Sequence, residues 1–106
     1  MKIYAKTPQG SRFHGEIQGI TFVRQISGDY VRWSDKSFCL NTSIINKLLD
    51  NGVGRLQFRY RMADKLKVYE IDVQRAFQIK PDVNEQGEEN IRIPIEDCKL
   101  VKTTEY

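Results

Sequence analysis

His14 is the one histidine in the sequence and Cys39 is one of two cysteines, so these residues are the best suited to nucleophilic chemistry. A histidine acts as a general base near neutral pH, and a cysteine beside it becomes a reactive thiolate. A small enzyme would therefore combine His14 and Cys39, with Asp35 to orient the imidazole ring. Large apolar residues flank Cys39 on both sides, however, and they predict a buried, unreactive thiol. We expect a protein that is not an enzyme, with both cysteines serving as small apolar core residues.

The sequence carries no motif for a cofactor or a metal ion. The segment 52–57 begins like a dinucleotide-binding fingerprint, but it lacks the third glycine and follows a helical pattern instead of preceding one. The cysteines, Cys39 and Cys98, do not have the spacing of a zinc site. The acids between residues 85 and 89 lack the order of a calcium-binding loop. We therefore expect neither a cofactor nor a metal.

Arginines and aromatic residues recur in the segments that have the pattern of strands. Guanidinium groups pair with phosphates and aromatic rings stack on bases, so this combination on a sheet is typical of proteins that hold single-stranded nucleic acid. The sequence predicts a basic sheet face that contacts nucleic acid or a nucleoprotein. Its candidate residues are Arg12, Tyr30, Arg32, Arg55, Arg59 and Arg61, with Arg24 and Trp33 among them in the sequence.

Charge is distributed unevenly along the chain. Residues 1–80 contain 14 Lys and Arg against seven Asp and Glu, whereas residues 81–106 contain three against seven. A basic body of this kind favours an anionic partner. The same distribution would also arise if the acidic end lay against the basic body, so charge alone leaves both interpretations open.

A second hypothesis is a protein-binding role. A small chain without a catalytic motif has the size and composition of an inhibitor or accessory protein of a phage or mobile element. Ile91, Ile93 and Ile95 alternate along an expected strand, and Pro94 places that strand at a sheet edge. Such an edge could pair with a strand of a partner protein.

The segment 55–73 is expected to position the basic face as a β-hairpin. Its apolar residues alternate strictly with its polar ones, which is the period of a strand buried on one side. The buried side is predicted to carry Leu56, Phe58, Tyr60 and Met62, and the open side Arg55, Gln57, Arg59 and Arg61. A turn at Asp64 and Lys65 would return the chain so that Phe58 lies opposite Ile71.

In this register Arg59 lies opposite Glu70, and the neighbouring arginines have no acid across from them. A cross-strand acid holds a basic side chain in place, so such an arginine is less available to a partner. We therefore expect Arg55 and Arg61 to be the main contacts of the basic face.

Further strands are expected at residues 1–6, 30–33, 76–80, 91–95 and 98–102. The segment 12–26 is expected to form either one long strand that bends at Gly15 and Gly19, which we favour, or two strands. The strand at 30–33 is expected to fold back on the long one, with Ile26 facing Val31 and Arg24 facing Trp33. A helix is predicted between a cap at Thr42 or Ser43 and a stop at 51–52, with one apolar face formed by Ile44, Ile45, Leu48 and Leu49.

This order of elements predicts an α+β fold. We expect a small, mostly antiparallel sheet or partly open barrel of about six or seven strands, with one short helix between strands three and four; an OB-like and a β-grasp-like order both match. Residues 1–106 are expected to form a single domain, with an exposed acidic loop at 82–90 and a frayed C-terminus at 103–106. No segment is apolar enough for a secretory signal or a membrane span, so we expect a cytoplasmic protein without a membrane partner.

Overall fold

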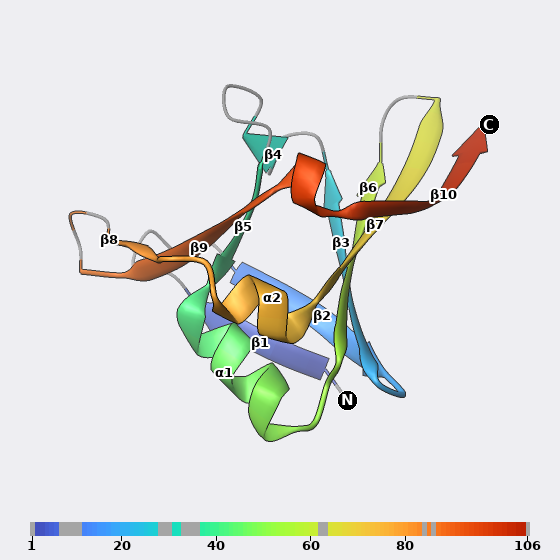
Figure 1. Ribbon diagram of the computed structural model, residues 1–106. Coiled ribbons are helices and arrows are strands. Elements are labelled where there is room, and N and C mark those ends of the chain that lie inside the picture. The colour runs from blue at the N-terminus through green and yellow to red at the C-terminus, as the bar shows by residue number, and fades with distance from the viewer. Residues whose placement is uncertain are drawn as a thin grey trace.

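The computed structural model describes residues 2–6, 12–27, 31–32, 37–61, 64–83, 85 and 87–105, and for residues 2–6, 12–14, 25–27 and 31–32 it describes the backbone alone. This part of the chain contains ten strands, two α-helices and a short 3-10 helix (Figure 1). The strands are β1 (Lys2–Lys6), β2 (Arg12–Gln18), β3 (Thr21–Ser27), β4 (Val31–Arg32), β5 (Ser37–Asn41), β6 (Arg55–Arg61), β7 (Lys65–Asp72), β8 (Asp82–Val83), β9 (Glu89–Pro94) and β10 (Lys99–Glu105). The helices are α1 (Thr42–Asp50), α2 (Val73–Phe77) and the 3-10 helix η2 (Ile95–Asp97).

The strands form two sheets, which we call sheet A and sheet B. Sheet A has six strands in the order β1-β2-β3-β6-β7-β10, and sheet B has four in the order β4-β5-β9-β8. In sheet A, β3 and β6 are parallel, and the other neighbouring strands of both sheets are antiparallel. A parallel pair needs a long crossover, and β4, β5 and α1 supply it here. The helices α1 and α2 pack against each other at one end of the molecule, between the two sheets (Figure 1).

The predicted α+β class is therefore confirmed, but the number and order of the strands differ from the OB-like or β-grasp-like order that the sequence suggested. One difference is the strand pair that replaces the long bent strand. A two-residue turn at Gly19 and Ile20 divides it into β2 and β3, with Gln18 paired with Thr21. Gly19 has a φ of 62°, the left-handed conformation that favours glycine at the first position of such a turn. Glycine thus reverses the chain at this point instead of bending it.

The strand β4 also differs from its prediction. It pairs with β5 in sheet B, where Val31 lies opposite Phe38, while Ile26 of β3 lies opposite Tyr60 of β6. The expected pair of Ile26 with Val31 is therefore wrong. The expected contact of Arg24 with Trp33 falls outside the described residues, because Trp33 is not among them.

Helix α1 forms where its apolar spacing predicted it. Ile44, Ile45 and Leu48 are buried on the face that meets the core. The cap is one residue earlier than expected, because the backbone N–H of Ser43 donates to the side chain of Asn41 at 2.8 Å. The helix ends at Asn51, as expected. It then needs packing for its stability, since nine residues are too few for an isolated helix.

The second helix, α2, overlaps the beginning of the strand expected at 76–80, and residues 78–80 are not part of a strand either. It buries Val73 and Ala76 against the core. A segment of five residues shows too little of the helical period to be recognised from its sequence.

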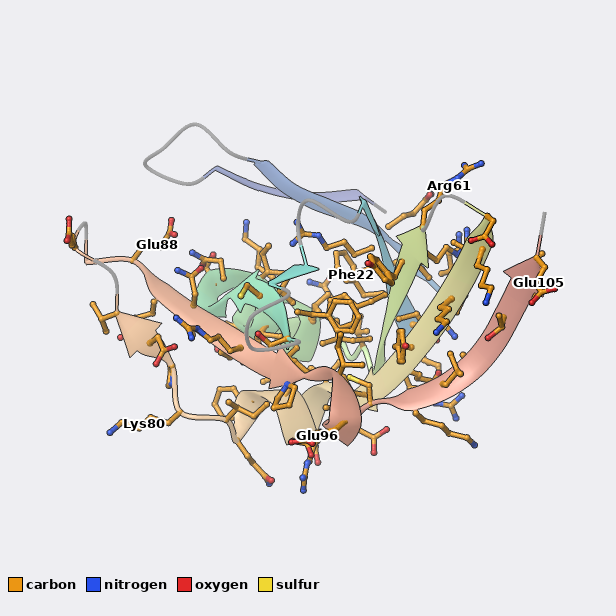
Figure 2. The ribbon with its side chains drawn as sticks, turned by 90° about the horizontal axis from the view of Figure 1, so that it is seen from above. Phe22, Arg61, Lys80, Glu88, Glu96 and Glu105 are labelled. Carbon is orange, nitrogen blue, oxygen red and sulfur yellow. The ribbon has the colours of Figure 1, made fainter. Side chains whose placement is uncertain are left out.

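The core lies between the two sheets, and two aromatic rings connect them. Phe38 of β5 and Phe58 of β6 are both buried and stack with ring centroids 4.4 Å apart. Phe22 of β3 also points into the interior (Figure 2). Its ring covers the backbone of Gly15 on β2 so closely that a Cβ atom at this position would overlap it. Both glycines of this segment therefore have a steric role: one permits the turn and the other accommodates Phe22.

The β6–β7 hairpin is confirmed, but its register differs from the prediction by two residues. Phe58 lies opposite Tyr69 instead of Ile71, and Ile71 pairs with Leu56. A shift of two leaves every side chain on its predicted face, because successive residues of a strand alternate between the two faces. Leu56, Phe58 and Tyr60 are therefore buried as expected, and Met62 lies outside the described residues, whereas the cross-strand neighbours of the arginines differ from the prediction.

The C-terminal part of the chain is more regular than its sequence suggested. Residues 103–105, expected to fray, belong to β10 and pair with residues 65–67 of β7. Most of the described residues of 82–90 are exposed, and the two ends of this segment, which was expected to be an acidic loop, pair as β8 and the start of β9. Strand β9 lies between β5 and β8, with Ile91 and Ile93 buried, so this segment is not the sheet edge that Pro94 indicated. Among the described residues, no helix has the length and apolar character needed to cross a membrane.

Candidate nucleic-acid interface

Sheet A has one face packed on the core and an outer face that points away from it. On β6 the residues Leu56, Phe58 and Tyr60 are buried in the core, while the intervening arginines are exposed. Arg55, Arg59 and Arg61 therefore share the outer face of one strand, as the sequence predicted. Their neighbours on β3, β7 and β10 determine which of these charges is balanced.

One half of the outer face, near the beginning of β6, has balanced charges. Arg55 lies opposite Asp72, and Lys99 of β10 lies opposite Glu70. Gln57 donates a hydrogen bond from Nε2 to Oε1 of Glu70 at 3.4 Å. Cross-strand pairs of opposite charge stabilise a sheet and hold the side chains in place. This half is therefore a structural surface.

The other half, toward the β6–β7 turn, is basic. Arg59 of β6 lies opposite the apolar Val68 of β7, and Val68 in turn lies opposite Lys102 of β10. Arg61 lies opposite Leu66. We call the three exposed cations Arg59, Arg61 and Lys102 the basic half of the outer face. None of them has an acid directly opposite in the β6–β7–β10 register that the structure describes.

The dimensions of the basic half follow from strand geometry. The Cα atoms of Arg59 and Arg61 are roughly 6.6 Å apart along β6, and Lys102 is roughly 10 Å from Arg59 across two strand spacings. Val68, between Arg59 and Lys102, is only 7% exposed although it lies outside the main core. An apolar residue becomes buried in this way where long neighbouring side chains lay their aliphatic parts over it.

The register corrects the choice of Arg55 and Arg61 as the main contacts. Arg55 is the arginine with an acid directly opposite, and Arg59 lies opposite an apolar residue instead of Glu70. The prediction of which charges are balanced was therefore reversed for these two arginines. Arg61 keeps its place in the candidate site.

The remaining predicted residues are not brought together on this face. Arg32 belongs to β4 in sheet B, and Arg12 is the first residue of β2, where it pairs with Lys6 of β1. Only the backbone of Arg12 and of Arg32 is described. Tyr30 lies outside the described residues. Arg24 is only 5% exposed and lies on the core face of β3, beside Phe58.

The acidic segment does not lie against the basic half. Figure 2 shows Glu88 and Arg61 at opposite ends of the molecule. Two other acids of the C-terminal part pair with arginines that are not on the outer face. Asp82 pairs with Arg92 at 2.8 Å, and Asp97 lies 3.9 Å from Arg75 of α2, a residue of the basic body.

The residues proposed for an enzyme lie in different sheets. His14 pairs with Tyr4 in sheet A, and Cys39 pairs with Arg92 in sheet B. Asp35 is outside the described residues. Cys39 was expected to be buried, but it is half-buried, because its side chain points away from the face that carries Phe38 and Leu40.

Cys98 is half-buried as well, and its thiol has the properties of an unreactive group. Its Sγ lies 3.6 Å from the carbonyl oxygen of Pro94, to which it can donate a hydrogen bond. Burial, with a smaller contribution from the negative charge of Asp97, raises the pKa of Cys98 to about 11. A thiol must lose its proton to act as a nucleophile, so this environment opposes catalysis by Cys98.

No group of three His, Cys, Asp or Glu side chains within the described ranges is arranged to hold a metal ion. Comparison with known proteins gives no family model, curated protein or solved structure that matches the chain. The geometry of the outer face is therefore the basis for any functional assignment.

Lys102 is the member of the basic half that sequence reasoning missed. Its charge was visible, but the strand that carries it was expected to be short and had no predicted partner. Only the pairing of β10 with β7 places Lys102 in line with Arg59. Such long-range pairings leave no mark on the local sequence.

Proposed function

We propose that this chain is a non-enzymatic binding module whose basic half contacts the phosphates of nucleic acid. One observation carries the proposal: Arg59 and Lys102 are exposed together on one sheet face with no acid opposite either of them in the described register, and the exposed Arg61 lies beside them on the same face. Guanidinium and ammonium groups pair with phosphate oxygens, and backbone phosphates supply most of the affinity of sequence-independent binding.

The strand that carries Arg59 and Arg61 is held on both sides and on its buried face. Arg59 is held between Phe58 and Tyr60, both of which are buried on the opposite face of β6. The strand itself is interior to sheet A, paired with β3 on one side and β7 on the other. Cations on such a scaffold lose less conformational freedom on binding than cations on a loop.

The chain offers a matched control for this proposal. Arg55 has the same residue type, strand and face as Arg59, but Asp72 lies opposite it. Arg59→Gln should weaken binding of a labelled oligonucleotide roughly tenfold at low salt, as expected for a charge-assisted hydrogen bond. Arg55→Gln should have a smaller effect. Equal losses in the two variants, or no binding by the parent protein at low salt, would contradict the proposal.

A protein partner is the second candidate, and β10 is the observation that favours it. This strand is the outer strand of sheet A, paired with β7 alone in the described part of the chain. Leu100 is 48% exposed and Val101 39% exposed beside that open edge. An open edge can accept a strand from another protein, although Lys99, Lys102 and a bulge between Leu100 and Lys102 are features that discourage such pairing. Capture of a protein by the parent chain but not by Val101→Lys, in the presence of nuclease, would favour this candidate.

A further inference from the structure

We infer that the nucleic acid bound by the basic half is double-stranded, held through its phosphates and without stacking of bases on protein rings. This inference rests on the proposed function and specifies its ligand. The sequence suggested the opposite, because arginines and aromatic residues alternate with each other along the strands. On β6 the structure separates the two kinds of residue: Phe58 and Tyr60 are buried on the core face, and Arg55, Arg59 and Arg61 are exposed on the outer face.

The aromatic side chains that the structure describes on sheet A all belong to the core face. Phe22 and Phe58 are buried, and so is Tyr60. Tyr69 lies opposite Phe58 and contacts Phe38 with ring centroids 5.6 Å apart. Three of these rings are buried and the fourth packs against the core, so none of them points to the outer face that carries the basic half.

Among the described side chains of β7 and β10, those next to the basic half carry no aromatic ring. In the described register its immediate neighbours on β7 and β10 are Val68, Leu66 and Thr104. Base stacking on aromatic side chains supplies much of the affinity of proteins that hold single strands. A face with cations and aliphatic side chains can contact phosphates, but it lacks that contribution.

The arrangement of the cations also fits two rows of phosphates better than one. Arg59 and Arg61 follow β6, and Lys102 stands roughly 10 Å to the side of Arg59 across the sheet. The grooves of a duplex separate its two phosphate rows by about 6–12 Å. The two arginines could therefore contact one row of phosphates while Lys102 contacts the other. A single strand has only one row of phosphates, so it would contact either the two arginines or the lysine.

A direct test compares a labelled duplex with each of its separated strands, at equal phosphate concentration and low salt, by fluorescence anisotropy. We expect the duplex to bind more tightly than either strand, with an affinity that is the same for duplexes of different base sequence. The Lys102→Gln variant should weaken binding of the duplex more than binding of a single strand.

Equal or tighter binding of a single strand would overturn the inference. Stacking of one base on an aromatic ring would raise the affinity for that strand roughly tenfold. In that case the proposed function would still stand, provided that Arg59→Gln weakens binding more than Arg55→Gln. Absence of binding to both forms would instead contradict the proposed function itself. Circular dichroism of each variant checks that its fold is intact.

Discussion

Phe38 and Phe58 stack with their ring planes 5° apart, and this contact joins sheet B to sheet A at the centre of the core. We predict that Phe58→Ala lowers the free energy of unfolding by about 3–5 kcal/mol, because it leaves a cavity between the sheets. A small domain has a total stability of about 5–15 kcal/mol, so the variant should be near the limit of folding. Urea denaturation measures the loss, and Phe58→Leu should lose less.

The same contact predicts coupling between the two residues. In a double-mutant cycle with Leu at each position, Phe38 and Phe58 should show an interaction free energy of about 0.5–1.5 kcal/mol. Phe77 provides the control, since it is 51% exposed on α2 and should show no coupling with Phe58. A coupling of zero between Phe38 and Phe58 would mean that the rings do not stack in solution.

Gly15 gives a second test of the packing. Gly15→Ala should destabilise the protein by about 1–3 kcal/mol, because its methyl group would overlap the ring of Phe22 and force a shift in the core. Gly54→Ala is the matched control: a methyl group there would meet only the carbonyl oxygen of Ile20, at 3.9 Å. Thermal melting of the two variants compares the costs. A smaller loss at Gly15 than at Gly54 would show that β2 does not lie under Phe22.

Cys98 should react slowly with a thiol reagent in the native state. Its pKa of about 11, against an ordinary value of 9.0, reduces the thiolate fraction near neutral pH about a hundredfold. The measurement is the labelling rate of a Cys39→Ala variant at pH 8, in buffer and in urea. Labelling in buffer as fast as in urea would contradict the buried position of Cys98.

The same raised pKa makes stability depend on pH. Folding disfavours the Cys98 thiolate, so the stabilisation is complete below pH 9, the unfolded pKa, and is lost as pH rises through about 11, the folded one. We expect the free energy of unfolding to fall across this range in the parent protein and to fall less in Cys98→Ala. Tyr60 contributes in the same direction above pH 10, because burial raises its pKa, with a smaller effect from Tyr69.

Sequence periodicity was a sound guide to which side chains are buried and a poor one to which residues are neighbours. The alternation along β6 predicted the burial of Leu56, Phe58 and Tyr60, and helical spacing did the same for α1. The register of β6 with β7 was wrong by two residues, because such a shift keeps all side chains on their faces and so leaves the hydrophobic pattern unchanged. The neighbours of Arg55 and Arg59 depend on that register.

Arg24 illustrates a different limit. Along one continuous strand it would lie on the same face as Arg12, His14 and Glu16, which are an even number of residues away. The two-residue turn at 19–20 reverses this relation: Gln18 pairs with Thr21, so the even-numbered positions of β3 belong to the core face. One unrecognised turn therefore moved an arginine from the expected binding surface to the interior.

Asp72 allows a test in the direction of tighter binding. It lies opposite Arg55 and precedes α2 without a capping hydrogen bond from its side chain. Asp72→Asn should therefore increase affinity for nucleic acid at low salt while leaving stability nearly unchanged, since Asn is an equally good residue at a helix N-cap. Weaker binding, with an intact fold, would contradict an approach of phosphates to the outer face of sheet A, because removal of a negative charge there can only favour an anion.

The salt dependence of nucleic-acid binding tests the central claim most directly. Each phosphate that the protein neutralises adds about 0.9 to the slope of log affinity against log salt for a duplex. The parent protein should therefore show a slope of about 2.7 from Arg59, Arg61 and Lys102, with any further contacts adding to it. Changing both Arg59 and Arg61 to Gln should lower the slope by about two units, whereas Arg55→Gln should leave it nearly unchanged. A slope that is the same in the parent and the double variant would show that the basic half does not contact phosphates.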